Sequence, residues 1–279
     1  MKIRPLCLTA IAALLALVSG CEASSTPVLE IATTTSVQNS GLLAVLLPAF
    51  EQAAGIAVRA HATGSGRALQ MLSNGTVDAV ISHSPIAEQR LTADHPDWSY
   101  RKLAYNWFVV VGPPSDPARV RGATDIADAF RRIAESDAMF VSRGDESGTH
   151  ERENAFWEAA GRRPITGRLL VSGRGMAQAL RHADEARAYT LSDAPTFRQL
   201  ADDLDLAVVF EDDPRLLNTY AFIHRTGHPE ADALAAWLFS DTGRTSLGGF
   251  MVEGRRGFEP WPPGCAAGAP SDVPCRPDK

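Results

Sequence analysis

Apolar runs alternate with helical patterns of hydrophobic residues through the first part of the chain. Residues 28–32, 56–60 and 77–81 have the apolar character of strands. Between them, apolar side chains recur at helical spacing over residues 42–50 and 68–72. Because strand, polar loop and helix repeat in this order, the pattern predicts a mostly parallel sheet with helices on both faces.

The remainder of the chain continues this alternation. An apolar run at residues 108–111 predicts a buried strand that leaves the first group of elements, and residues 220–223 predict a strand that returns to it. Further strands are expected at residues 139–141, 169–171, 188–191 and 207–210. The whole pattern is that of an α/β protein.

Four polar stretches occupy one structural position, the end of a predicted strand before a helix. They are residues 33–36, within a polar loop that extends to residue 40, and residues 63–66, 142–149 and 172–175. In open α/β sheets this edge is where ligands bind, and helix N-termini there favour anions. Hydroxyls, close-approaching glycine backbone and an arginine are the donors that a tetrahedral oxyanion requires.

Each stretch also has a simpler explanation, since Ser and Thr cap helices and Gly forms turns. Capping alone explains residues 33–36 equally well, and a turn is the simpler interpretation of residues 63–66. Residues 142–149 favour the anion site, because a cap needs one hydroxyl and this stretch adds Arg143 and a second hydroxyl. The four stretches together favour an oxyanion site.

Composition limits the class of partner. The chain has 279 residues, 45% of them hydrophobic, which suits one large domain or two lobes. A net charge of −6 argues against a general nucleic-acid binder, so an anion site must be local.

The N-terminus has the features of an export signal. A short basic start precedes an apolar segment at residues 6–18, which is typical of a signal peptide. The sequence VSGC at residues 18–21 resembles a bacterial lipobox, so residues 1–21 are expected to be a lipoprotein signal peptide that ends at a lipid-bearing Cys21. Residues 22–27 then form a tether, and this anchor is the only membrane contact expected. An ordinary secretory signal peptide remains the alternative.

Two cysteines, Cys265 and Cys275, lie in a Pro- and Gly-rich tail at residues 261–279. They are candidates for a disulfide in an oxidising compartment. No CxxC pair or neighbouring histidine completes a metal site around them, so no metal ligands are expected.

Several motifs together resemble the tungstate-binding proteins of ABC-type oxyanion importers. They are ATTTS, GLL…LLPAF, TGSGRAL, SRGDESGTH, SGRGM and AYTLSD, and the similarity covers about residues 28–260. The resemblance implies an α/β, two-lobe, periplasmic-binding-protein-like (class II) fold with mixed sheets flanked by helices and a ligand cleft between the lobes. Lobe 1 would comprise residues 28–112 and 218–260, and lobe 2 residues 113–217.

The resemblance also implies a ligand set, a partner and a location. The oxyanion would be contacted from lobe 1 by Thr34, Thr35 and Ser36 with Ser65 beside them, and from lobe 2 by Arg143, Ser147, Gly148 and Thr149 with backbone donors near Ser172 and Gly173. The protein would be a monomeric, extracytoplasmic lipoprotein without cofactor or catalysis that delivers tungstate, or molybdate, to an ABC permease.

Departures from the family pattern leave the ligand open. Arg67 and Arg174 stand where many relatives have Gln, and Ala194-Pro195 replaces a frequent Arg-Gly. Asp145 and Glu146 lie close enough in sequence to leave phosphate as an alternative, with sulfate a further one. Asp145 is expected to orient Arg143 or to accept hydrogen bonds from its loop.

A different class of function, a hydrolase, is suggested by Ser147, His150 and Asp145. No G-x-S-x-G elbow precedes a helix, and triad partners normally come from distant segments, so the sequence disfavours this reading. His83 follows a strand and is either a cleft residue or a satisfied histidine at a strand end. A lipoprotein that presents its anion to a receptor instead of a permease is a third possibility.

Overall fold

The computed structural model describes residues 27–262. The predicted signal peptide, the predicted lipidation site Cys21, most of the predicted tether and the pair Cys265 and Cys275 lie outside the described residues. Within residues 27–262, no helix has both the length and the apolar character needed to cross a membrane.

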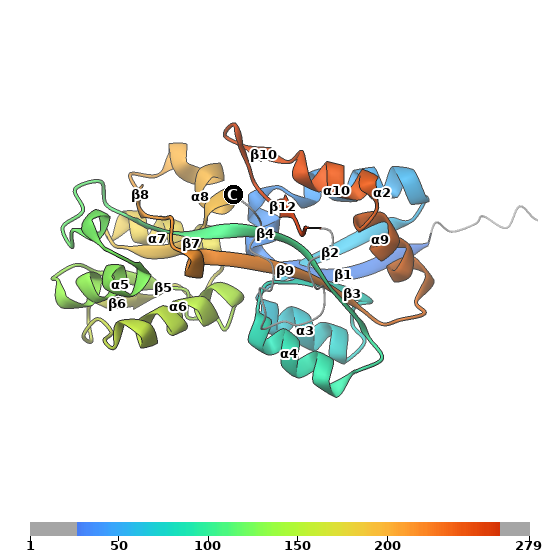
Figure 1. Cartoon of the computed structure of the whole chain (residues 1–279), viewed down its shortest axis with the longest axis horizontal. Coiled ribbons are helices and arrows are strands. Elements are labelled where there is room, and N and C mark those ends of the chain that lie inside the picture. The colour runs from blue at the N-terminus through green and yellow to red at the C-terminus, as the bar shows by residue number, and fades with distance from the viewer. Residues whose placement is uncertain (1–26, 263–279) are drawn as a thin grey trace, which may run out of the picture.

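Two long strands, β4 (Ser99–Gly112) and β9 (Leu217–His224), connect two groups of elements (Figure 1). They belong to an eight-stranded sheet in which β12 (Glu259–Pro260), β4, β9, β3 (Ala79–Ser82), β1 (Val28–Thr34) and β2 (Ala57–Thr63) follow in that order. The second half of β4 also pairs with β7 (Thr190–Asp193) and β8 (Ala207–Phe210). One strand therefore takes part in the sheets of both groups.

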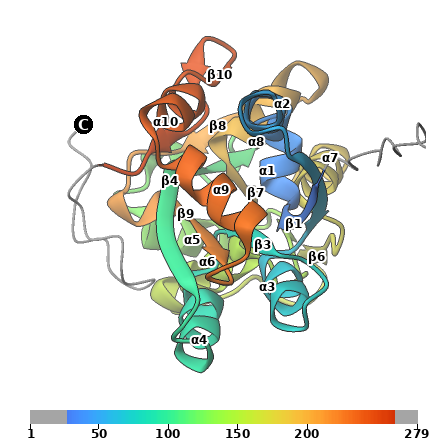
Figure 2. The same cartoon turned by 90° about the vertical axis from the view of Figure 1, so that its right-hand side faces the viewer.

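Lobe 1 surrounds the parallel pairs β1–β2 and β1–β3. In Figures 1 and 2, α3 (Ser65–Ser73) and α4 (Pro85–Asp94) lie on one side of its strands. On the other side lie α2 (Leu43–Ala54) and α10 (Asp241–Gly248), followed by the short hairpin β10 (Met251–Val252) and β11 (Arg255–Arg256). The helix α9 (Pro229–Leu238) packs on β1 and β9.

Lobe 2 contains the parallel pair β5 (Phe140–Ser142) and β6 (Leu169–Val171). Its helices are α5 (Ile126–Glu135), α6 (Gly148–Ala160), α7 (Met176–Glu185) and α8 (Ala194–Leu200). Three short 3₁₀ turns cover Val120–Gly122, Ala201–Asp203 and Pro214–Leu216. The aromatic rings of Phe130, Phe140 and Trp157 pack edge to face or tilted at the centre of this lobe.

Hydrophobic packing changes from one lobe to the other within β4 and β9. Leu103 and Ala104 pack with the lobe 1 strands, whereas residues 108–111 pack with lobe 2. In β9, Tyr220 packs in lobe 1, and Leu216, just before the strand, packs in lobe 2. The change in β4 therefore falls between residues 104 and 108, and the lobe boundary at residue 112 stays a prediction.

The expectation of parallel strands is confirmed for β1, β2 and β3, but it does not hold for the sheet as a whole. β4 runs antiparallel to β7, β8, β9 and β12, and β3 runs antiparallel to β9, so the sheets are mixed, as the family resemblance implies. The reason is that β4 and β9 pass between the lobes in opposite directions. The first half of β4 was not predicted because Arg101 and Lys102 interrupt its apolar pattern; the structure buries Lys102, whose Nζ donates to Thr219 Oγ1 at 2.8 Å.

The polar loop predicted at residues 33–40 is also different. Residues 33 and 34 complete β1, and Thr35–Ser40 forms the short helix α1. The Thr34 hydroxyl caps this helix, and Gly41, with φ of 85°, ends it in the left-handed conformation that glycine adopts without strain.

Candidate functional site

The four polar stretches lie where lobe 1 meets lobe 2. Each follows a strand, namely β1, β2, β5 or β6, and precedes α1, α3, α6 or α7. A Cβ placed on Gly64 would lie 3.5 Å from the Asp145 carbonyl oxygen, and one on Gly175 would lie 3.2 Å from Thr35 Oγ1. The Thr196 hydroxyl donates to the Ser36 carbonyl oxygen at 3.2 Å. The lobes are therefore in contact around these stretches.

Arg143, the residue after β5, is one of the largest fully buried side chains, with 1% exposure. Its Nη2 donates to Asp145 Oδ2 at 2.5 Å, and its backbone N–H donates to Glu153 Oε2 at 3.1 Å. Its Nη1 contacts only the weak acceptor Met176 Sδ, at 3.5 Å, and its Nε has no partner within residues 27–262. The guanidinium thus has buried N–H groups without a strong acceptor, and leaving such groups unpaired destabilises the folded protein.

Capping and anion binding are compatible at these hydroxyls. Thr34 Oγ1 accepts from the Val37 N–H at 3.2 Å, and Ser147 Oγ accepts from the His150 N–H at 3.3 Å. In both contacts the hydroxyl oxygen is the acceptor, so its own proton remains available to donate. Ser65 Oγ is placed in the same way, since it accepts from the His83 N–H at 3.4 Å.

Further hydroxyls at this junction are buried without a partner. Within the described residues, the hydroxyl oxygens of Ser36, Thr149 and Ser172 are inaccessible to water and make no hydrogen bond. Leaving such a group unsatisfied costs about 1–3 kcal/mol. A ligand made of acceptor oxygens would relieve this cost, so the geometry favours an oxyanion at this position.

The N-terminus of α6 adds backbone donors. The N–H groups of Gly148 and Thr149 belong to the first helical turn, which has no intrahelical acceptor for them. A Cβ on Gly148 would lie 2.2 Å from the His83 carbonyl oxygen. Glycine is therefore required for lobe 1 to approach this helix end.

The amides of Ser172 and Gly173 continue the pairing of β5 with β6. The Ser172 N–H donates to the Ser142 carbonyl oxygen and the Gly173 N–H to that of Arg143, both at 2.9 Å. Backbone donors near these two residues stay a prediction. This stretch also offers the Ser172 hydroxyl, which has no hydrogen-bond partner within residues 27–262. Thr35 is half-buried with its side chain against Gly175.

Carboxylates surround the arginine more closely than the sequence indicated. Burial works to raise the pKa of Asp145, but the Arg143 charge and hydrogen bonds from Ser147 and Arg143 outweigh it, and the pKa is lowered. Asp145 Oδ1 also accepts from the Ser147 N–H at 3.2 Å, so Asp145 both orients Arg143 and holds its loop, as expected. Burial raises the pKa of Glu153 and of Asp193.

Asp193 was not predicted as a site residue, although the pattern of its surroundings could have revealed it. It ends β7 and caps α8, with Pro195 in the first turn, so it stands at the same strand-to-helix position as the four stretches. The structure shows a fifth junction of the same kind.

His83 is a buried residue at the contact between the lobes. Its Nδ1 lies 3.1 Å from Asn218 Oδ1 and its ring stacks on Tyr220 at 5.1 Å between centroids. Burial lowers the pKa of His83 to about 4. The imidazole is therefore neutral near pH 7, and it supports the loop between β3 and α4.

The hydrolase arrangement is absent from the described residues. Ser147 Oγ accepts from the backbone of His150, and His150 Nδ1 in turn accepts from the Glu146 N–H at 3.1 Å. Both oxygens of Asp145 are held by Arg143 and the Ser147 N–H. No nucleophile is paired with a base in this group.

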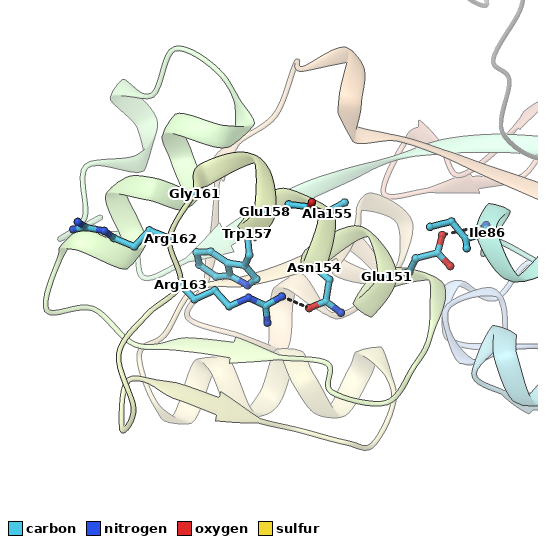
Figure 3. A pocket seen from close by; sticks show the side chains of 9 residues that line it. All are labelled: Ile86, Glu151, Asn154, Ala155, Trp157, Glu158, Gly161, Arg162 and Arg163. Atoms are coloured by element: carbon cyan, nitrogen blue, oxygen red, sulfur yellow. Dashed lines mark hydrogen bonds between the residues drawn. The ribbon is translucent and has the colours of Figure 1, made fainter.

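The large surface pocket lies beside this site and is distinct from it. Figure 3 shows that it follows the outer side of α6, where Arg163 donates to Asn154 Oδ1 at 2.8 Å. Glu151, at one end, reaches across to α4, where it accepts from the Ser84 hydroxyl and from the Ile86 N–H. The pocket is open and lined by both charge signs, which gives it no evident ligand.

Among residues 27–262, no group of three or more His, Cys, Asp or Glu side chains could hold a metal ion. The donors gathered at the junction are instead hydroxyls, helix amides and one buried guanidinium. Two lobes joined by β4 and β9, with such donors between them, are the architecture of a solute-binding protein.

Comparisons with known proteins agree with this class. A PBP superfamily domain matches residues 22–242. The tungstate-binding protein TupA of Peptoclostridium acidaminophilum is 35% identical, over 88% of this chain and 93% of that protein. The crystal structure of the tungstate ABC transporter from Geobacter sulfurreducens superposes with a TM-score of 0.72 at 34% identity, covering 80% of this chain and 98% of that one.

TupA from Desulfovibrio alaskensis G20 superposes with a TM-score of 0.69 at 35% identity, covering 84% of this chain and 98% of that one. The chain belongs to the PBP superfamily and, within it, to the family of the TupA tungstate-binding proteins, which are binding proteins and not enzymes.

Proposed function

We propose that this protein is the extracytoplasmic solute-binding component of an ABC transporter and that it captures tungstate between its lobes. The observation that carries this proposal is a set of buried donors where the lobes meet, which have no hydrogen-bond partner within residues 27–262. They are Arg143 Nε and the hydroxyls of Ser36, Thr149 and Ser172. The names of its relatives supply the ligand.

The donor set suits a fully deprotonated oxyanion. Hydroxyls and helix amides donate to its oxygens, and Arg143 supplies one positive charge in a fork of N–H groups. The sequence left two carboxylates open as phosphate acceptors; Asp145 already has both oxygens partnered, and Glu146 is exposed. The proposed ligand set is therefore dominated by donors, and molybdate, with the same charge and shape, is the expected competitor.

Capture would couple to lobe closure. Ser36 and Thr34 belong to lobe 1, and Arg143 and Thr149 to lobe 2, so only contacting lobes offer the whole set. The bound anion then stabilises the closed arrangement by its differential contacts. Delivery to a permease and anchoring of the protein through a lipid on Cys21 complete the proposal.

Calorimetric titration of the purified protein with tungstate, molybdate, sulfate and phosphate, in a buffer free of these anions, tests the function. We expect tight one-to-one binding of tungstate and weak or undetectable binding of phosphate. Arg143→Ala should lose at least about 100-fold in affinity, because a buried charge-assisted donor is removed.

Arg67→Ala is the matched control, because Arg67 lies beside a site loop but is exposed. It should bind tungstate within about threefold of the wild type, a change of under about 1 kcal/mol. Tight binding of phosphate in place of tungstate would support the proposed oxyanion site and contradict tungstate as its ligand. Equal losses of tungstate affinity in Arg143→Ala and Arg67→Ala would contradict the proposal that Arg143 binds the anion.

A further inference from the structure

Asp193 is a fully buried carboxyl group with one free oxygen. Its Oδ2 accepts from the Thr196 N–H at 3.0 Å and so caps α8. Its Oδ1 is buried and has no hydrogen-bond partner among residues 27–262. The cap explains one oxygen of this side chain and leaves the other unexplained.

Residues of the opposite lobe contribute to the burial of Asp193. The Ser36 hydroxyl of α1 lies close enough to the carboxyl to act to lower its pKa, an effect that burial outweighs. Neither Ser36 Oγ nor Asp193 Oδ1 is within the geometry of a formed hydrogen bond in the described residues. The Thr196 hydroxyl donates to the Ser36 carbonyl oxygen and joins the two lobes next to them. Separation of the lobes would therefore expose Asp193 to water.

Among the described residues, three ionisable groups lie near enough to interact with the charge of the carboxyl. They are Arg143 after β5, Arg198 on α8 and Tyr220 on β9, and α1 carries no ionisable side chain. Burial raises the pKa of Asp193 above its ordinary value despite the nearby Arg143 charge. A bound dianion adds negative charge next to the same arginine, which favours the neutral carboxyl further.

We propose that Asp193 takes up one proton from solvent when the lobes close on the oxyanion, and that the neutral carboxyl then donates to Ser36 Oγ. This donation leaves the Ser36 proton directed at the anion. An ionised Asp193 would instead draw that proton to itself and present lone pairs to the ligand. The inference rests on the proposed oxyanion site and makes Asp193 a positioning residue for Ser36.

Specificity follows from the same arrangement. With Asp193 neutral, the Ser36–Asp193 corner offers only a donor to the ligand, which suits a fully deprotonated anion. A hydrogen-bearing anion such as hydrogen phosphate would need an acceptor there, and providing one would require an ionised carboxyl in a buried position.

Calorimetry in two buffers of different ionisation enthalpy measures the protons taken up per tungstate bound. At about pH 8, well above the ordinary pKa of histidine, the histidines do not contribute. We expect net uptake of up to one proton for the wild type and none for Asp193→Asn, whose amide retains the cap and a donor beside Ser36. Wild-type affinity should then fall as the pH rises, by up to about tenfold per pH unit, whereas the variant should change less than about threefold between pH 7 and 9.

Asp213→Asn is the matched control, because Asp213 is another buried capping carboxyl whose oxygens both have partners. It should leave the proton count unchanged. Infrared difference spectra of the wild type give a second measurement, in which tungstate should produce the C=O stretch of a neutral carboxylic acid. A wild-type count near zero without that band, or a count retained in Asp193→Asn, would overturn the inference. Absence of tungstate binding in every protein would instead contradict the proposed function.

Discussion

Gly148 tests whether contact between the lobes is required for binding. A methyl group on this residue would lie 2.2 Å from the His83 carbonyl oxygen and 2.8 Å from its carbonyl carbon. Real Cβ atoms approach no closer than 3.0 Å, so the carbonyl oxygen and the new methyl must separate by a further 0.8 Å or more. Gly148→Ala retains the N–H and the helix, and its main effect is on the approach to His83, whose ring Nδ1 would also lie 2.9 Å from the new methyl.

The expected loss can be worked from the contacts that such a shift would disturb. Hydrogen bonds to a charged ligand contribute about 1.5–3 kcal/mol each, and a displaced lobe would lose at least about two of them. The affinity of Gly148→Ala for tungstate should therefore fall by about 10² to 10⁴-fold. Titration calorimetry measures this loss, and small-angle scattering with and without tungstate shows whether the variant still compacts.

Gly66 provides the matched control for Gly148. It also faces the other lobe, but a Cβ there would lie at an ordinary 3.5 Å from the Glu146 carbonyl oxygen. Gly66→Ala should bind within about threefold of the wild type, a change of under about 1 kcal/mol, and should stabilise α3 by about 0.5–1 kcal/mol. Unchanged affinity in Gly148→Ala would refute the requirement for close contact at this point.

Three further changes test other parts of the site. Thr149→Val removes a buried hydroxyl that has no partner within the described residues, so thermal unfolding without ligand should show equal or greater stability while tungstate affinity falls about tenfold or more. Glu151→Gln weakens the contact of α6 with α4 and should speed tungstate release about 3- to 10-fold in stopped-flow experiments, whereas Glu158→Gln on the same helix should not. His83 has a pKa of about 4 when buried, against an ordinary 6.5, so its contribution to stability is complete above pH 6.5 and is lost as the pH falls toward 4. Urea unfolding should show about 3 kcal/mol less acid destabilisation in His83→Gln, and identical pH profiles would contradict the assignment.

The position of the candidate site was predictable because it depends on a topological regularity. Polar stretches at the carboxyl ends of strands meet at one edge of the structure whichever helices follow them. The sequence therefore placed residues 33–36, 63–66, 142–149 and 172–175 together without knowledge of any contact, and the structure shows them together. Their roles in binding remain a proposal.

What the sequence did not predict depends on contacts between distant segments. The direction of β4 and β9 is set by their passage between the lobes, and no local pattern encodes it. The hydrogen bonds of the Ser172 and Gly173 amides were not predicted because their acceptors on residues 142 and 143 come from another strand. The second oxygen of Asp193 is buried without a hydrogen-bond partner, and its closeness to Ser36, far away in the chain, cannot be predicted from the local sequence.

The hydroxyls that cap α1 and α6 restrict how this protein can change its ligand over evolutionary time. Replacing Thr34 or Ser147 by an apolar residue would remove a proposed ligand donor and would also destabilise a helix by about 1 kcal/mol. Exchange between Ser and Thr avoids both losses, so drift at these two positions should be confined to that pair. New selectivity would then arise at residues without a capping duty, such as Arg174, which is exposed in the loop between β6 and α7.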